Sequence, residues 1–337
     1  MKKVITFGEI MLRLSTGTGM LLRQANQLSV HYGGAEANVA VSLSHFGYQS
    51  YFVSKIPENS LGRAVEQHLK SHGVRTDFLL KGGERLGSYY VEEGAGERSS
   101  QVTYDRKYSS FSQLEADEID IEGILQEVSL IHITGITLAL SPALQELVLQ
   151  IFKKAKEMGV LVSFDFNYRS KLWSQQEAAE AIKLLMPYVD ICFCGELDAV
   201  HLLGIEPVEE SLSQEERLTF YYLEILKSYP NIQYMGSTFR TVQSASSNKL
   251  QGNLFTSGKL YQSKVHHLEP IVERIGGGDS YAAGILWGIL EGFPAQQIIS
   301  FATAASALKH TIQGDCSSFT NEEVMQFAKN ESGMINR

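Results

Sequence analysis

Residues Glu273 to Gly284 read Glu-Arg-Ile-Gly-Gly-Gly-Asp-Ser-Tyr-Ala-Ala-Gly, and much of what the sequence predicts depends on this run. Its three consecutive glycines have no Cβ atoms, so their backbone N–H groups can crowd around an anion, and the apolar helix that follows adds the positive end of its dipole. Asp279 comes directly after them, where a carboxylate can take a hydroxyl proton while charge develops on a phosphoryl group. The run therefore predicts a kinase-type site.

The same run also fits an ordinary helix start. Glycines before a helix make simple turns, and an acidic residue in the first helical turn is favourable because it interacts with the helix dipole. Gly-Gly-Gly-Asp by itself leaves both interpretations open. The rest of the sequence has to distinguish them.

A length of 337 residues allows two average domains or one large α/β domain, and we expect a single α/β domain over residues 1–337. The 29 Lys and Arg against 38 Asp and Glu give a net charge of −9, and the basic residues form no run. This argues against nucleic acid or an anionic membrane as a partner. Three cysteines, no signal-peptide core and no apolar run of ~18 residues lead us to expect a cytoplasmic protein.

Short β-branched apolar runs alternate with stretches in which apolar residues have helical spacing. The runs predict buried strands at 4–7, 51–53, 130–134, 160–164 and 189–193. Helices are predicted at 35–46, 61–72, 142–158, 175–186, 279–291 and 294–310, and a last one begins at the capping box Thr320 to Glu323. This alternation predicts a mostly parallel sheet flanked by helices.

Two segments interrupt the alternation. Residues 11–32 and 85–108 are rich in Thr, Ser, Tyr and Gly, and parts of them alternate with a period of two. We expect them to form a small β-sheet that covers a site as a lid. Long surface hairpins without a role are the alternative. The exposed edge of such a sheet could also join two copies of the chain in a homodimer.

Two further motifs suggest ligand contacts. Gly33 and Gly34 precede a predicted helix, where they allow a ligand near the backbone, and Asn38 can hydrogen-bond to hydroxyl groups. Arg169 follows Asn167 at the end of a predicted strand, where α/β sheets gather ligand residues, and a guanidinium can bind a carboxylate or a phosphate with two hydrogen bonds. A structural turn and a surface salt bridge are the respective alternatives.

The sequence contains neither of two common nucleotide motifs. Gly252 to Leu260 lacks the spacing and the Ser or Thr of a P-loop, and no Gly-x-Gly-x-x-Gly follows a strand. The histidines lack metal-ligand spacing. A P-loop enzyme and a nicotinamide cofactor are therefore not supported.

The two glycine motifs, Gly33 to Asn38 and Gly276 to Asp279, resemble in this order the two-part signature of the ribokinase-type (PfkB) carbohydrate kinases. The likeness covers essentially the whole chain. Within this family, residues 8–14, 32–38, 273–279 and 307–311 are most similar to the 2-keto-3-deoxygluconate kinases. The resemblance implies a ribokinase-like α/β fold with a small β-sheet lid.

The resemblance also implies an activity. ATP with Mg²⁺ would donate its γ-phosphoryl group directly to the terminal hydroxyl of the sugar acid, giving 2-keto-3-deoxy-6-phosphogluconate. Asp279 would be the base, and Gly276, Gly277 and Gly278 would stabilise the transferred group. Substrate would contact Gly33, Gly34, Asn38, Tyr89, Tyr104, Arg106 and Arg169.

Arg106 is the main specificity determinant in this interpretation, because a fork-like guanidinium suits the carboxylate that distinguishes a sugar acid from a neutral sugar. An exposed charge on a strand is the alternative. The nucleotide would contact Asn167, Ser237, Thr238, Arg240, Gly276 and Gly278. Ser237, Thr238 and Arg240 are expected to follow a strand that ends at Met235.

Two positions depart from the family pattern. Where these kinases usually carry Asn-x-x-Glu near the metal, this chain reads Gly195-Glu196-Leu197-Asp198, and it has Glu273 in place of an aspartate. We expect Glu196 and Asp198 to be the metal-binding residues, and such changes often cost ~10–100-fold in affinity or activity. A kinase for a neutral sugar, fructokinase- or ribokinase-like, and a non-catalytic sugar-acid-binding protein of the same fold remain the alternatives.

Overall fold

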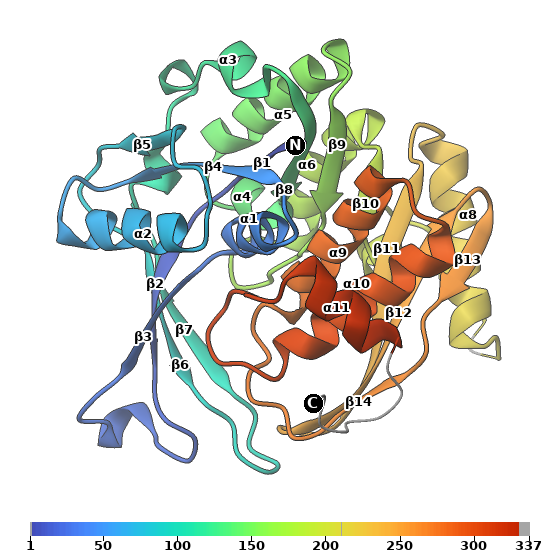
Figure 1. Cartoon of the computed structure of the whole chain (residues 1–337). Helices are drawn as coiled ribbons and strands as arrows, with labels where there is room; N and C mark the ends of the chain where they lie inside the picture. The colour runs from blue at the N-terminus through green and yellow to red at the C-terminus, as the bar shows by residue number, and fades with distance from the viewer. Residues whose placement is uncertain (1, 210, 330–337) are drawn as a thin grey trace.

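The structure, a computed structural model, describes residues 2–209 and 211–329, and one large sheet forms its centre (Figure 1). Strands β5, β4, β1, β8, β9, β10 and β11 lie side by side and run parallel. In that order they span Leu79–Lys81, Gln49–Ile56, Lys3–Phe7, Val128–Thr134, Leu161–Asp165, Ile191–Phe193 and Tyr234–Ser244. The sheet continues antiparallel through β12 (Ser247–Thr256), β13 (Lys259–Gln262) and β14 (His266–Leu268).

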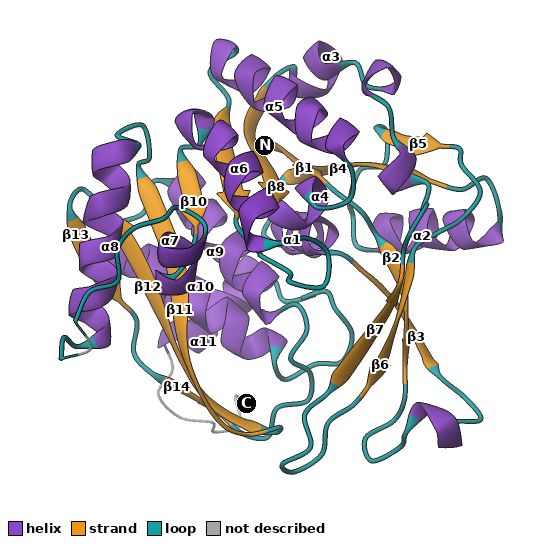
Figure 2. Cartoon of the chain, turned by 180° about the vertical axis from the view of Figure 1, so that it is seen from behind, coloured by secondary structure: helices purple, strands orange, loops and turns teal. Residues whose placement is uncertain are grey.

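Helices cover both faces of this sheet (Figures 1 and 2). Because side chains alternate along a strand, Ile5 and Phe7 of β1 enter one apolar core and Val4 enters the other. The first core includes α3 (Ile121–Leu125), α5 (Pro142–Glu157), α6 (Gln175–Leu185) and α8 (Gln214–Ser228). The second includes α1 (Ala35–His45), α9 (Gly277–Glu291), α10 (Ala295–Lys309) and α11 (Asn321–Lys329).

Three shorter or peripheral helices complete the layers: α2 (Ser60–Ser71), α4 (Gly135–Leu138) and α7 (Glu196–His201).

The predicted helix start signals act as expected, since the Ser141 hydroxyl accepts the Leu144 N–H at 3.2 Å. Thr320 and Glu323 cap α11 reciprocally, at 2.7 and 3.3 Å. The predicted mostly parallel sheet with flanking helices is therefore confirmed. No helix within residues 2–209 and 211–329 combines the length and apolar character needed to cross a membrane.

One predicted boundary is wrong. β11 does not end at Met235 but continues to Ser244, so Ser237, Thr238 and Arg240 lie within a strand. The strand persists because β12 pairs with it antiparallel along this length and supplies partners for its backbone groups. The polar composition of this stretch resembles a loop, although its Thr and Val residues favour an extended chain.

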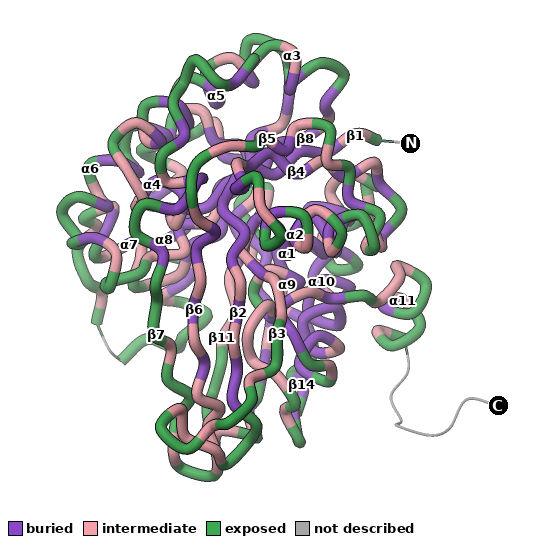
Figure 3. Tube along the Cα trace, turned by 90° about the vertical axis from the view of Figure 1, so that its left-hand side faces the viewer, coloured by how far each residue is buried: buried purple, intermediate pink, exposed green. Residues whose placement is uncertain are grey.

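The small lid sheet is present as predicted. It consists of β3 (Ser29–Gly33), β2 (Met11–Ser15), β6 (Ser88–Glu92) and β7 (Gln101–Asp105), in that order. β2 and β6 are parallel, and the outer pairs are antiparallel. Figure 3 shows the lid strands extending from the same side of the helical body as the ends of β11 and β14.

Candidate active site

A cavity of about 560 Å³ lies where the lid faces the two glycine motifs. A second hollow of about 610 Å³ adjoins it and shares six lining residues with it, namely Asp165, Asn167, Arg169, Thr238, Arg240 and Gly278. The first cavity brings together the predicted substrate residues Gly33, Gly34, Asn38, Tyr89, Tyr104, Arg106 and Arg169, together with Gly276 and Asp279. Ser237, Glu196 and Asp198 line the second. The fold thus gathers residues that the sequence separates widely.

The glycine run begins α9. Gly276 has a left-handed backbone with φ +83°, and a Cβ at this position would come within 1.8 Å of the Asp315 carbonyl oxygen. Gly277 faces away from the cavity, because a Cβ there would come within 2.4 Å of the His310 ring. Gly278 is exposed, and a Cβ there would meet no heavy atom within 4 Å. The three glycines therefore serve different purposes, and open space beside Gly278 faces the cavity.

This difference yields a matched pair of variants. Gly276→Ala should lower the free energy of unfolding by at least about 2 kcal/mol, because a left-handed residue with a Cβ is strained and this one also meets a carbonyl oxygen. Gly278→Ala should keep wild-type stability and lose activity, because its methyl group occupies space next to Asp279. Denaturant unfolding and steady-state kinetics on both variants check this. Equal stability of the two would contradict the assignment.

Gly33 and Gly34 are required for packing, whereas the sequence suggested only that they let a ligand approach the backbone. Both residues line the cavity, but a Cβ at Gly33 would meet the Asp315 carboxylate at 2.3 Å. A Cβ at Gly34 would meet the Glu9 carbonyl oxygen at 1.9 Å. The protein's own atoms already exclude a side chain at both positions.

Asp279 and Asn38 join the two glycine motifs. The Asn38 amide donates to the Asp279 carboxylate at 2.7 Å, so the first turns of α1 and α9 meet at this carboxylate. Removal from bulk water raises the pKa of Asp279 to about 6, although the Asn38 hydrogen bond and Arg169 oppose the rise. Asp279 is thus mainly ionised at neutral pH and still basic enough to accept a proton.

Asp165, at the end of β9, is a further carboxyl group in the cavity and interacts with Asp279. Desolvation first, and the charge of Asp279 second, raise the pKa of Asp165 to about 8. When the surroundings give two nearby carboxyl groups different pKa values, one is protonated and the other ionised at a pH between those values. Asp165 is therefore the protonated group at pH 7 and Asp279 the ionised one.

The pKa of Asp279 predicts an acidic limit to activity. If Asp279 is the base, it must be deprotonated, so kcat/KM should fall tenfold for each pH unit below about 6 and by only about a fifth from pH 7.5 to 6.5. A pH profile of kcat/KM in buffers of constant ionic strength measures this limb. A kcat/KM that stays constant down to pH 4.5 would contradict the assignment of Asp279 as the base.

Four arginines line the first cavity, namely Arg106, Arg169, Arg240 and Arg274. Arg106 follows β7 and is only 7% exposed, so the alternative of an exposed strand charge is wrong. Its Nε donates to Glu9 at 2.9 Å, and Nη2 binds the same carboxylate oxygen. Within the described chain Nη1 has no partner, which leaves one edge of this guanidinium for a ligand.

Arg169 is exposed and forms no ion pair with the described residues, which removes the alternative of a surface salt bridge. Its Nη1 donates to the Tyr168 carbonyl at 3.2 Å. Arg274, by contrast, binds the Ser244 carbonyl at 2.6 Å and the Asn248 amide oxygen at 2.9 Å. Among the described residues, Arg240 makes one hydrogen bond, from Nη2 to the His310 ring at 3.4 Å. Arg106, Arg169 and Arg240 therefore keep N–H groups that no described residue binds.

The expected metal-binding residues have other partners. Glu196 accepts from Arg217 Nε at 3.0 Å, and Asp198 accepts the Gly195 N–H at 2.8 Å. In the described ranges no three His, Cys, Asp or Glu side chains are grouped as a metal site. Mg²⁺ at phosphate-transfer sites usually needs only one or two carboxylates besides phosphate oxygens and water. Asp198 fits this requirement better than Glu196, whose charge Arg217 already balances.

Five charged cavity residues were not among the predicted site residues: Glu9, Glu36, Asp165, Arg274 and Asp315. Glu9 and Arg274 belong to the quoted segments 8–14 and 273–279, so attention to buried charges there could have found them. Asp315 lies in a turn after α10 that carries no recognisable pattern.

A carboxylate beside the N-terminus of a helix, in a cavity lined by arginines, suits an enzyme that transfers a phosphoryl group to a hydroxyl. The description "pfkB family carbohydrate kinase" matches residues 1–221. The chain is 31% identical over 335 residues to the 2-dehydro-3-deoxygalactonokinase of Haloferax volcanii, covering 99% of each. It is 28% identical to the 2-dehydro-3-deoxygluconokinase of Bacillus subtilis, covering 96% of this chain and 94% of that one.

A solved structure has the same fold. The 2-dehydro-3-deoxygluconokinase from Thermotoga maritima matches with a TM-score of 0.94 and 40% identity, covering 98% of this chain and 100% of that one. The chain belongs to the pfkB family of carbohydrate kinases. The predicted ribokinase-like fold and the resemblance to 2-keto-3-deoxygluconate kinases are confirmed, since 2-dehydro and 2-keto name the same group.

Proposed function

We propose that this protein is an ATP-dependent kinase that phosphorylates the terminal hydroxyl of 2-keto-3-deoxygluconate, giving the 6-phosphate. The observation that carries the proposal is the Asp279 carboxylate, which Asn38 holds at 2.7 Å beside the start of α9. This carboxylate lines the same cavity as the guanidinium groups of Arg106 and Arg169. One cavity thus offers a base and cations for an acidic substrate.

The chain's own groups suggest how transfer proceeds. Asp279 accepts the proton of the terminal hydroxyl as that oxygen attacks phosphorus, and no covalent enzyme intermediate is needed. The backbone N–H groups at the start of α9, from Gly276 to Gly278, point their dipole at the phosphoryl oxygens. Asn38 keeps the carboxylate of Asp279 in place for the proton.

The lid selects the substrate in this proposal. Glu9 binds Nε and Nη2 of Arg106. The free Nη1 of Arg106 then binds the sugar-acid carboxylate. Tyr104 packs against both Arg106 and Tyr89, with 5.8 Å from its ring centre to the guanidinium carbon and 5.9 Å between the tyrosine rings. Gly33 and Gly34 form the facing wall. A neutral sugar would offer the free Nη1 of Arg106 no carboxylate to bind.

The second hollow is the proposed nucleotide site, with Asn167, Ser237, Thr238 and Arg240 as contacts. Arg169, Arg240 and Gly278 line both hollows, so they lie where a triphosphate would meet the sugar. Mg²⁺ would screen the phosphate charge when bound, and Asp198 is the residue we propose to hold it, with Glu196 as the weaker candidate.

The galactonate epimer is a second candidate substrate, because the Haloferax volcanii relative is named for it. Incubation of the purified protein with ATP, Mg²⁺ and either epimer, followed by identification of the phosphorylated product, tests the proposal. We expect the 6-phosphate from the gluconate form. Calorimetric binding of the sugar acid without any product would favour the non-catalytic alternative instead.

A further inference from the structure

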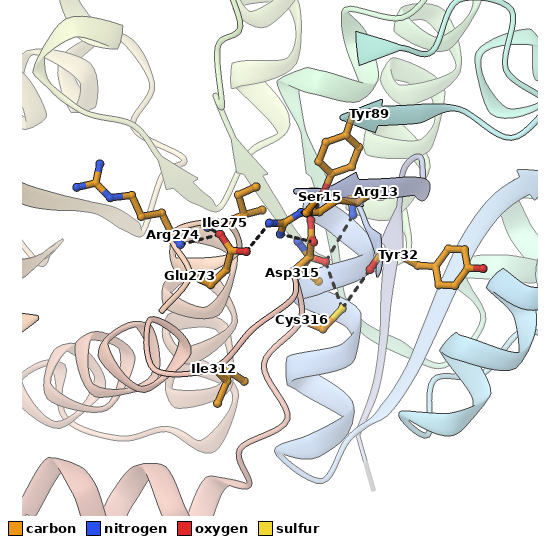
Figure 4. A network of polar contacts seen from close by, with 12 residues as sticks. Arg13, Ser15, Tyr32, Tyr89, Glu273, Arg274, Ile275, Ile312, Asp315 and Cys316 are labelled. Atoms are coloured by element: carbon orange, nitrogen blue, oxygen red, sulfur yellow. Dashed lines mark hydrogen bonds and ion pairs between the residues drawn. The ribbon is translucent and has the colours of Figure 1, made fainter. Parts of the chain in front are cut away.

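Arg13 is a lid residue whose side chain reaches the body. It lies in β2, and with 1% exposure it is among the largest fully buried side chains. Its Nε donates to the Ser15 hydroxyl at 2.7 Å, and Nη1 donates to Asp315 at 2.9 Å. Nη2 binds Glu273 (Figure 4). One guanidinium thus joins the lid to two segments of the body.

The Glu273 carboxylate holds backbone next to the glycine run, and the main chain at Asp315 packs against that run. The second oxygen of Glu273 accepts the N–H groups of Arg274 at 2.8 Å and Ile275 at 3.1 Å, which directly precede Gly276. The Asp315 carbonyl lies where a Cβ of Gly276 would be. A shift of either segment would therefore move the first glycine of the proposed anion site.

Asp315 also binds the lid a second time, because the Tyr89 hydroxyl of β6 donates to its other oxygen. Arg13 itself is not among the residues that line the cavity, whereas Tyr89, Asp315 and Gly276 are. A buried ion triad adds little net stability compared with well-packed apolar side chains of similar volume. Stability alone is therefore a poor account of this arrangement.

We infer that Arg13 is a positioning residue that couples the lid to the glycine run. Its Nη1 and Nη2 bind Asp315 and Glu273, which connects β2 to both segments. The lid and the backbone at Gly276 are therefore held in a fixed relative position. A fixed position of Gly276 would promote phosphoryl transfer, so the inference rests on the proposed function. A lysine could keep the charge but could not bind both carboxylates with this planar geometry.

The triad also adjusts the charge around Asp279. That carboxylate faces Asn38 from α1, Arg169 and Asp165 from the end of β9, Lys309 from α10, and Asp315 with Cys316 from the turn after α10. Without Arg13, the charges of Asp315 and Glu273 would lack their nearest partner. The pKa of Asp279 should then rise further, because a like charge nearby disfavours ionisation.

Three variants separate position from charge: Arg13→Lys, Arg13→Met, and Arg13→Met combined with Glu273→Gln and Asp315→Asn. The triple variant leaves no unpaired buried charge, so it tests the inference if Arg13→Met alone does not fold. All three should lose about 100-fold in kcat, as expected for a small displacement of reacting groups. Calorimetric affinity for a non-hydrolysable ATP analogue should stay within about threefold of wild type in all three.

Two readouts distinguish positioning from a merely structural effect. The acidic limb of kcat/KM should move to higher pH in Arg13→Met, stay in place in Arg13→Lys, and move to lower pH in the triple variant, which removes the net negative charge of the triad. Hydrogen exchange should become faster in all three variants both at β2 and at residues 276–278. A folded variant with wild-type kcat, or faster exchange confined to β2, would overturn the inference.

The kcat and kcat/KM measurements use the acceptor that the wild-type protein phosphorylates best. If wild type phosphorylates no acceptor, the proposed function fails, and the exchange experiment still decides whether Arg13 couples β2 to residues 276–278. The control is Arg85→Lys, because Arg85 is an exposed arginine paired with Asp105 of the lid at 2.8 Å. It should match wild type in kcat and in exchange at residues 276–278, and slow catalysis in this control would overturn the specific role of Arg13.

Discussion

Replacing Asp279 with Asn should lower kcat by about 10²–10⁴-fold and leave the protein folded. Asparagine has the same shape as aspartate, and its amide oxygen can still accept the hydrogen bond from Asn38. It cannot accept the hydroxyl proton at neutral pH. Affinity for the sugar acid should change little, because the carboxylate acts on the proton in transfer rather than on the substrate charge. Steady-state kinetics and a thermal unfolding curve measure both effects.

Glu291→Gln is the matched control for Asp279→Asn. Glu291 is the last residue of α9, and its carboxylate accepts the Tyr48 hydroxyl at 2.6 Å, so the change neutralises an acid on the same helix away from the cavity. It should leave kcat unchanged. A kcat of Asp279→Asn within tenfold of wild type would mean that another group accepts the proton.

Loss of the Arg106 guanidinium should selectively weaken catalysis with the sugar acid. Arg106→Gln alone would leave Glu9 buried without its partner, which can cost about 3–5 kcal/mol of stability. The double variant Glu9→Gln with Arg106→Gln avoids this. We expect its kcat/KM for the sugar acid to fall by about 10- to 100-fold, because a hydrogen bond to a charged group contributes about 1.5–3 kcal/mol.

The same double variant should change kcat/KM for a neutral sugar by less than about threefold, since no carboxylate contact is lost. Arg85→Gln is the control, because Arg85 is an exposed arginine near the same strand and pairs with Asp105. A coupled assay with both classes of sugar gives the two ratios. An equal fall for acidic and neutral sugars would assign Arg106 to the structure of the lid instead.

Local patterns in the sequence were sufficient for most of the fold. Capping at Ser141 and the period-two segments of the lid predicted where elements lie, because these features depend on neighbouring residues. The end of β11 was missed for the opposite reason. Its residues beyond Met235 stay extended because β12 pairs with them, and pairing depends on a second segment.

The site was predictable as a set of residues but not as a set of interactions. The glycine motifs identified Asp279 and Asn38, yet only the fold shows that they are hydrogen-bonded across 241 positions. Arg106 was expected to bind the substrate carboxylate, and Glu9, 97 positions away, also binds it. Likewise, the pairing of Glu196 with Arg217 depends on how α7 and α8 pack. Buried charges find partners that sequence spacing does not reveal.

The most direct test of the account is the ratio of kcat/KM for 2-keto-3-deoxygluconate to kcat/KM for fructose and for ribose. Wild-type protein, ATP and Mg²⁺ in one coupled assay provide all three values. We expect a preference for the sugar acid of at least about 100-fold, because only the acid offers a carboxylate to the free Nη1 of Arg106. A higher kcat/KM for either neutral sugar would contradict it.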